Sequence, residues 1–214
     1  MRWQHLRVRG LPTEMSEPVI IDLLRHGEVE GKQWAFRGSL DVPLSTLGRA
    51  QMDAVGMALD GNQFSTIASS PLQRCRLFAE SLADSRSTQL ELLHDMREID
   101  FGDWEGKGSQ EIDEKLLKRF WSSPVGFCPP GGESFNDFTS RIISSWGQWL
   151  DGADGEHRLL VAHGGVIRVL LGHMLNMPMD SIWRLHLPYA SWSRVSLFEG
   201  QQPRVLFMNQ EPQA

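Results

Sequence analysis

Two short apolar segments, each followed closely by a histidine and a glycine, constrain the fold of this chain more than any other feature. The first spans residues 19–24 and precedes Arg25 and His26, and the second spans residues 158–162 and precedes His163. Brief apolar runs that end at turn-forming residues are typical of strands buried on both faces of a parallel sheet. We therefore predict two such strands, each with a histidine just beyond its carboxyl end.

Helical signals lie between these strands. Ser45 is a candidate N-cap for a helix that stops at Gly61. Directly after an expected strand at residues 66–69, Ser70 is a candidate N-cap and Pro71 suits the first position of a second helix. Strands that alternate with helices imply an α/β fold with helices on both faces of the sheet.

The complete pattern predicts a three-layer α/β/α sandwich around a mostly parallel sheet. Residues 1–18 are predicted to be an N-terminal extension, and residues 19–210 a single domain. Amphipathic patterns behind Ser109 and Ser134 predict a helical insertion around residues 105–150.

The composition is that of a folded globular chain without an overall basic character. Its 214 residues carry 21 Lys and Arg against 27 Asp and Glu, a net charge of −6. Mild acidity argues against general binding to nucleic acids or membrane surfaces, since both attract basic faces. No apolar run reaches the ~20 residues of a membrane span, and two cysteines are too few for a disulfide scaffold. We expect a cytoplasmic protein without nucleic-acid or membrane partners, whose eight tryptophans leave room for a homodimer interface.

Two histidines and two arginines are the first candidates for chemistry. Because the carboxyl ends of parallel strands form the ligand crevice of an open α/β sheet, His26 and His163 are predicted to meet there. Arg25 precedes the first histidine, and Arg74 lies in the first turn of the helix that follows residues 66–69. Guanidinium forks match phosphate oxygens, and a helix N-terminus favours anions. The set predicts a site for a dianion such as a small-molecule phosphate monoester.

A carboxylate-rich segment, residues 96–106, is the candidate source of a general acid. It holds Glu98, Asp100, Asp103 and Glu105 around turn-forming glycines. The negative charge of a phosphate would keep a neighbouring carboxyl group protonated, and that group could then protonate a leaving oxygen. Composition and spacing do not distinguish among the four residues.

Four separated motifs resemble, in order, those of the histidine phosphatase superfamily, also called phosphoglycerate mutase-like. They are residues 24–28 (LRHGE), 69–74 (SSPLQR), 97–106 (REIDFGDWEG) and 161–165 (VAHGG). The resemblance covers residues 19–175 and implies a phosphoglycerate mutase-like fold for the single domain.

The same resemblance implies roles for particular residues. His26 is expected to be the nucleophile that becomes phosphohistidine, and Glu98 the proton donor. Arg25, Arg74 and His163 are expected to hold the phosphate oxygens, and His163 thereby to take part in catalysis. No metal and no cofactor is implied.

Recognition of the leaving group is less constrained. Many relatives carry Asn shortly after the first motif, where this chain has Gly31 and Lys32, and the following loop matches only with a one-residue gap. By their positions, Lys32, Arg37, Gly38 and Gly164 are expected to contact substrate. Within the superfamily the chain most resembles the alpha-ribazole phosphatases of cobalamin assembly. The expected substrate is therefore α-ribazole 5′-phosphate, recognised through side chains between residues 120 and 135.

Three other functions are weighed against that expectation: a broad-specificity phosphatase, a phosphoglycerate mutase and an inactive phosphate-binding module. Resemblance implies that mutases hold a second phosphate with paired arginines. The one adjacent basic pair between residues 108 and 130 is Lys118 with Arg119, on a predicted amphipathic helix. An inactive module would be expected to lose His26 or Glu98, and both are present. Hydrolysis is favoured.

Overall fold

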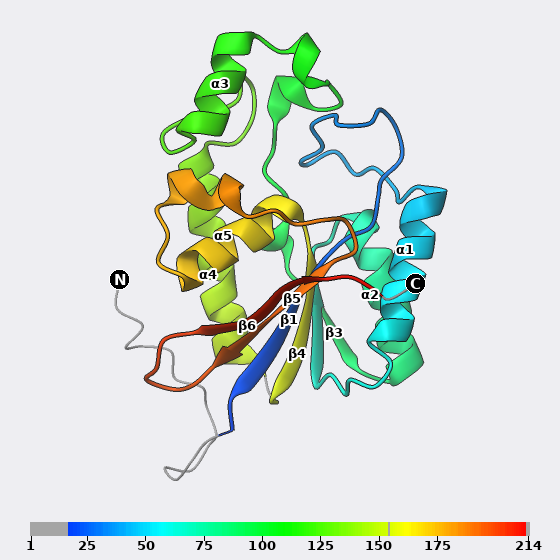
Figure 1. Cartoon of the computed structure of the whole chain (residues 1–214). Helices are drawn as coiled ribbons and strands as arrows, with labels where there is room; N and C mark the ends of the chain where they lie inside the picture. The colour runs from blue at the N-terminus through cyan, green and yellow to red at the C-terminus, as the bar shows by residue number, and fades with distance from the viewer. Residues whose placement is uncertain (1–16, 154, 213–214) are drawn as a thin grey trace.

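A six-stranded sheet with the strand order β3-β2-β4-β1-β5-β6 runs through the centre of the molecule (Figure 1). The computed structural model describes residues 17–153 and 155–212, so almost all of the predicted extension, residues 1–18, lies outside the described residues. The strands are β1 (Val19–Arg25), β2 (Thr66–Ser69), β3 (Gln89–Leu92), β4 (His157–Ala162), β5 (Trp192–Leu197) and β6 (Arg204–Gln210).

The sheet is mostly parallel, as predicted. β1 pairs with β4, β4 with β2 and β2 with β3 in parallel, whereas β5 and β6 are antiparallel to their neighbours. Arg25 lies opposite Ala162 in the β1–β4 register, and the backbone N–H of His26 donates to the carbonyl of Ala162 at 3.1 Å. His26 and His163 therefore leave the sheet side by side.

Helices cover both faces of the sheet, which confirms the predicted three-layer sandwich. α1 (Thr46–Ala58) and α2 (Gln73–Arg86) lie on one face, and α4 (Phe135–Gly152) and α5 (Gly164–Met174) lie on the other (Figure 1). Each face carries its own buried apolar cluster. Alternate residues of β1 supply both clusters, since Leu23 belongs to one and Leu24 to the other.

The segment between β3 and α4 lies beyond the carboxyl ends of the strands. It contains η1 (His94–Met96), η2 (Gly102–Trp104), η3 (Ser109–Glu111) and α3 (Glu114–Ser122). Phe120 of α3 is fully buried, with its ring centre 5.7 Å from that of Trp104 and 6.2 Å from that of Phe36. Packing of α3 therefore fixes the loop around Phe36, which borders the cavity described below. α4, also within the predicted insertion, packs against α5 and the sheet core.

The start of α2 differs from the expectation that Ser70 caps it. The helix begins at Gln73 with Leu72 as its N-cap, and that cap position makes no side-chain hydrogen bond. The Ser70 hydroxyl accepts from the backbone N–H of Leu72 at 3.3 Å, ahead of the helix, and lies 2.7 Å from Nε2 of His163. The capping prediction was wrong because the helix begins three residues after Ser70, whose hydroxyl holds the turn before it and the ring of His163.

Among the described residues, no helix combines the length and the apolar character that crossing a membrane requires. The predicted homodimer and cytoplasmic location stay predictions.

Candidate active site

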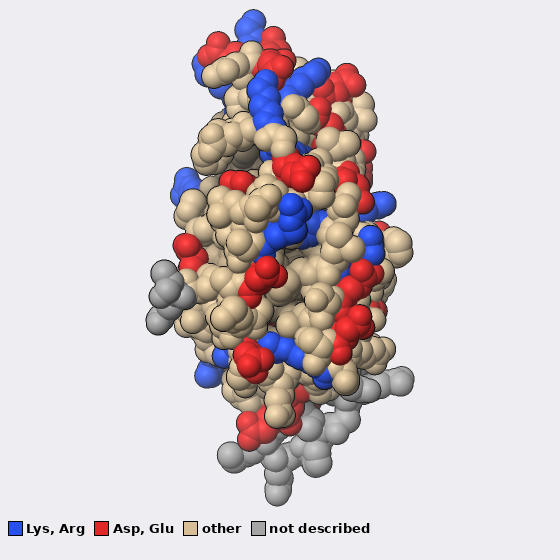
Figure 2. All heavy atoms as spheres, turned by 90° about the vertical axis from the view of Figure 1, so that its right-hand side faces the viewer, with Lys and Arg blue, Asp and Glu red and all other residues tan. Residues whose placement is uncertain are grey.

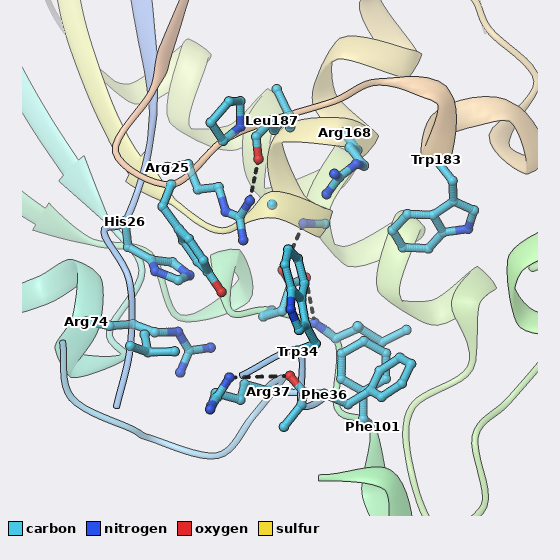
Figure 3. Close-up of a pocket in the computed structure, with 18 of the residues that line it drawn as sticks. Arg25, His26, Trp34, Phe36, Arg37, Arg74, Phe101, Arg168, Trp183 and Leu187 are labelled. Atoms are coloured by element: carbon cyan, nitrogen blue, oxygen red, sulfur yellow. Dashed lines mark hydrogen bonds between the residues drawn. The ribbon is translucent and has the colours of Figure 1, made fainter. Parts of the chain in front are cut away.

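A cavity of about 560 Å³ opens beyond the carboxyl ends of β1 and β4. Figure 3 shows His26 and Arg74 at one end of it and Trp183 at the other, with Arg25 and Arg168 near each other between them. Six of the residues expected at the site line this cavity: Arg25, His26, Arg37, Arg74, Glu98 and Gly164. Three expected residues, Lys32, Gly38 and His163, are not part of its wall.

His26 has the chemical state of a nucleophile. Its Nδ1 lies 2.7 Å from the carbonyl oxygen of Gly27, and because a carbonyl only accepts, Nδ1 carries the proton. Burial, followed by the charges of Arg74 and Arg25, holds the pKa of His26 well below its ordinary value. The ring is therefore neutral near pH 7, with its lone pair on Nε2.

His163 lies behind this ring. The two ring centres are 5.2 Å apart in an edge-on arrangement, and His163 is fully buried. Its Nδ1 accepts from Nε of Arg74 at 3.2 Å, so its Nε2 carries the proton and donates to the Ser70 hydroxyl. Burial and the charge of Arg74 hold the pKa of His163 well below its ordinary value. Here the neutral ring orients Arg74, and its expected contact with phosphate stays a prediction.

Arg74 is held on all three of its nitrogens. Besides the bond to His163, Nη1 donates to the carbonyl of Leu40 at 2.8 Å and Nη2 to that of Gly38 at 2.6 Å. Each terminal nitrogen keeps one hydrogen for a ligand, because a guanidinium group carries five N–H donors. The side chain is 1% exposed, so its charge faces the cavity from a fixed position.

Gly38, whose carbonyl accepts from Arg74, lies where the surrounding backbone leaves room for glycine alone. A Cβ atom there would lie 1.7 Å from the carbonyl oxygen of Ile99, so no side chain fits. Lys32 pairs with Glu111 on the exposed surface. A direct contact of Lys32 or Gly38 with substrate stays a prediction.

Glu98 is the carboxylate of the 96–106 segment that reaches the cavity. Oε2 accepts from the backbone N–H of Gly165 at 2.8 Å, and Oε1 accepts from that of Ile99 at 3.1 Å. A Cβ atom on Gly165 would lie 2.2 Å from Oε1, which explains the glycine at this position. The carboxylate therefore rests on the N-terminal turn of α5, facing the arginines.

The three other carboxylates do not line the cavity, and two of them, Glu105 and Asp100, accept hydrogen bonds from the backbone. Glu105 accepts from the backbone N–H groups of Gly38, Ser39 and Phe101 at 2.9 to 3.1 Å. Asp100 accepts from the N–H of Gly102 at 2.9 Å. Glu105 thus joins the loop that carries Gly38 to the loop that carries Glu98.

Sequence reasoning missed several residues of the cavity. Arg168 and Tyr189 line it, and the guanidinium carbon of Arg25 lies 4.0 Å above the centre of the Tyr189 ring. The available signal for Arg168 was its position as a charged residue in the otherwise apolar run of α5. Five further aromatic side chains line the cavity: Trp34, Phe36, Phe101, Trp121 and Trp183.

The charged side chains of the wall are four arginines and one carboxylate, so the cavity attracts anions although the chain is acidic. Figure 2 shows one face of the molecule, on which a group of basic side chains lies near the centre and acidic side chains lie above and below it and along the right-hand edge. In residues 17–153 and 155–212, no group of His, Cys, Asp and Glu is arranged to hold a metal ion.

Comparison with known proteins adds independent findings. The chain matches the family model of the histidine phosphatase superfamily (branch 1) over residues 21–211. A bifunctional protein of Mycobacterium tuberculosis is 32% identical over 206 residues, which cover 94% of this chain and 55% of that protein. The chain therefore spans about half the length of this relative.

Two similar phosphatases are matched over most of their length. An adenosylcobalamin/alpha-ribazole phosphatase of Salmonella typhimurium is 28% identical over 185 residues, covering 83% of this chain and 90% of that one. The structure of a mycobacterial glucosyl-3-phosphoglycerate phosphatase with inorganic phosphate has a TM-score of 0.78 and 29% identity, covering 92% of this chain and 99% of that one.

Proposed function

The chain belongs to branch 1 of the histidine phosphatase superfamily, and from this premise we propose that it hydrolyses small phosphate monoesters through a phosphohistidine on His26. One observation carries the proposal. The His26 ring is neutral and is held through Nδ1–H by the carbonyl of Gly27, so its Nε2 lone pair is free at an arginine-lined cavity.

The reaction has two steps that share the same groups. First, Nε2 of His26 forms a bond to phosphorus as the bond to the leaving oxygen breaks, and Glu98 gives that oxygen a proton. Then water attacks phosphorus, passes a proton to Glu98 and frees His26 as inorganic phosphate leaves. Arg25 and Arg74 offset the charge on the non-bridging oxygens in both steps.

The placement of the basic pair on α3 supports hydrolysis over phosphoglycerate mutase activity. Lys118 pairs with Glu114 on the exposed surface, and neither Lys118 nor Arg119 lines the cavity. Helix α3 therefore supplies no paired cations for a second phosphate. Both His26 and Glu98 face the cavity, which also argues against an inactive binding module.

For the leaving group, α-ribazole 5′-phosphate is the first candidate. The similarity to the Salmonella enzyme supports it, and so does the aromatic wall, because flat rings stack on aromatic side chains. Of the region 120–135, from which recognition was expected, Trp121 lines the cavity.

A phosphorylated hydroxy acid is the second candidate. The similarity to the mycobacterial enzyme raises it, and the cation of Arg168 beside the aromatic wall is the feature of this chain that favours it. A broad-specificity phosphatase would accept both classes at comparable rates.

Trapping of the covalent intermediate tests the proposed reaction. Brief incubation with labelled substrate, followed by digestion and mass analysis, is expected to find an acid-labile phosphoryl group on His26. His26→Ala should lose turnover and label while keeping its thermal melting temperature. The matched control is His94→Ala, at an exposed site outside the cavity, which should keep both. A label on another residue, or an active His26→Ala variant, would refute the proposal.

A further inference from the structure

Arg141 of α4 lies close to Glu98 but outside the cavity that holds His26. A second, smaller cavity of about 370 Å³ borders both Arg141 and Glu98. Glu98 lines both cavities, whereas Arg141 lines only the second. Arg141 can therefore act on the proposed proton donor without touching a substrate in the first cavity.

All five N–H donors of Arg141 bind other groups of the protein. Nε and Nη2 donate to the carboxylate of Glu133 at 2.6 and 2.8 Å. The remaining donors bind three backbone carbonyls, those of Asp95, Arg97 and Glu98, the last of them from Nη2 at 3.1 Å. Because a guanidinium group carries five N–H donors, none is left for a ligand. The contacts of Arg141 thus concern the backbone that carries Glu98.

Glu133 extends these contacts to Asp100. The backbone N–H of Glu133 donates to the carbonyl of Asp100 at 2.9 Å, and Oε2 of Glu133 accepts from the N–H of Asp100 at 3.4 Å. The Arg141 and Glu133 side chains are each 18% exposed, and a pair joined by two parallel hydrogen bonds has a fixed geometry. We call Arg141 and Glu133 the backbone clamp, because together they hold residues 95–100.

Glu98 is held from two neighbouring helices. Its carboxylate accepts from the N–H of Gly165 in α5, whereas its backbone carbonyl accepts from Arg141 in α4. The two helices pack against each other. The clamp therefore fixes the backbone of Glu98, and α5 fixes its carboxylate. A misplacement of the carboxylate by about 1 Å would be enough to cost ~10²-fold in rate.

We propose that Arg141 is a positioning residue for proton donation: the backbone clamp holds residues 95–100 so that the Glu98 carboxylate reaches the leaving oxygen of the substrate. Loss of Arg141 damages proton transfer and spares the binding of phosphate, which rests on Arg25 and Arg74 in the proposed reaction. This inference rests on the proposed phosphatase function and deepens it.

Arg141→Met tests the proposal with two substrates that differ in their need for a proton. The alcohol oxygen of glycerol 3-phosphate must be protonated as it leaves, whereas p-nitrophenolate is stable as an anion. The variant should lower kcat for glycerol 3-phosphate by roughly 10²-fold and kcat for p-nitrophenyl phosphate far less. Inhibition by inorganic phosphate should equal that of the parent. Arg141→Lys should restore only part of the loss, because an ammonium group has three donors in place of five.

Arg86→Met is the matched control. Arg86 also donates to two backbone carbonyls, those of Asn62 and Gly56, and its side chain is 14% exposed, but it lies at the end of α2 and lines neither cavity. This variant should lose thermal stability and keep the parent's ratio of kcat between the two substrates. A ratio that changes as much as in Arg141→Met would trace the effect to general loosening of the fold and overturn the inference.

A double variant tests whether Arg141 acts through Glu98. Glu98→Gln removes the proton donor, so the addition of Arg141→Met should change the ratio between the substrates little further. A further change as large as that of Arg141→Met alone overturns the inference. So does an Arg141→Met or Arg141→Lys variant that keeps the parent's ratio, or one that loses equally on both substrates.

Failure of the proposed function gives a different result. A parent protein that turns over neither ester refutes that function, and the inference with it. If the parent turns over both esters and Glu98→Gln keeps the parent's ratio, Glu98 is not the proton donor. The inference then fails while the phosphohistidine on His26 stands.

Discussion

Replacing Gly165 with alanine should remove acid catalysis without unfolding the protein. The new Cβ atom would lie 2.2 Å from Oε1 of Glu98 and 2.9 Å from its Cδ. Ordinary contact needs at least 3.4 Å, so the carboxylate has to retreat by about 1 Å, and a shift of that size is enough to cost ~10²-fold in rate. The 2.8 Å bond from the N–H of Gly165 to Oε2 is lost at the same time.

The loss should depend on the leaving group. A general acid contributes ~10²–10⁴-fold where the leaving oxygen needs a proton, so Gly165→Ala should lower kcat/KM for glycerol 3-phosphate by roughly 10²-fold or more. For p-nitrophenyl phosphate, whose leaving group is stable as an anion, the loss should be far smaller. The melting temperature should barely change, since the displaced atoms belong to the end of a flexible side chain.

Gly172→Ala is the control on the same helix. Its Cβ atom would lie 2.6 Å from Cγ2 of the buried Ile182, so this variant should lose thermal stability and keep the parent's ratio between the two substrates. Equal losses on both substrates for Gly165→Ala, or none at all, would show that Glu98 is not the proton donor.

Three further predictions follow from the same contacts. Arg74→Lys should cost on the order of 2–4 kcal/mol of transition-state stabilisation, measured as kcat/KM. An ammonium group cannot keep the bonds to His163, Leu40 and Gly38 and also hold phosphate. A kcat/KM within twofold of the parent's would contradict this prediction. Activity should survive exhaustive chelation with EDTA, since arginines supply the charge at the cavity; restoration of lost activity by an added metal would count against it. Burial raises the pKa of Asp22, but hydrogen bonds from Arg194 and His157 outweigh burial, so the net effect is a lowered pKa. Ionised Asp22 therefore stabilises the fold at pH values above the pKa of the unfolded carboxyl group. This stabilisation is lost as the pH falls through the pKa of the folded state. Denaturant titrations should show Asp22→Asn losing up to about 3 kcal/mol at pH 7 and a flatter acid limb; an unchanged acid limb argues against this assignment.

The sheet and the meeting of the two histidines could be predicted because both depend on local signals. Most residues of β1 and β4 are apolar, and His26 and His163 directly follow these two strands. The strands and their ends could therefore be predicted from the sequence. β3 was not predicted because, although polar and apolar residues alternate in Gln89–Leu92, the strand has only four residues and these are exposed or half-buried.

The details of the candidate site could not be predicted from the sequence, because they depend on tertiary contacts. Four carboxylates in one loop look equivalent until the N–H of Gly165 is seen to hold Glu98 and backbone groups are seen to occupy Glu105. Arg168 stands out as a charge in an apolar helix, but its direction depends on the carbonyl of Leu185. Lys32 looked available for substrate until Glu111, nearly eighty residues later, was found beside it.

The pairing of β1 with β4 has a consequence for how this protein reaches its native state. The register joins Ile20 to His157, more than half of the chain apart, and the two histidines stand at the far end of that same pair of strands. Closing so long a loop is slow relative to forming helices such as α4, because its entropy is lost before the contacts form. The nucleophile and the ring behind it are therefore assembled late during folding. Regain of turnover after dilution from denaturant would then lag behind regain of helical circular dichroism, and enzymatic activity would report on completion of the central sheet.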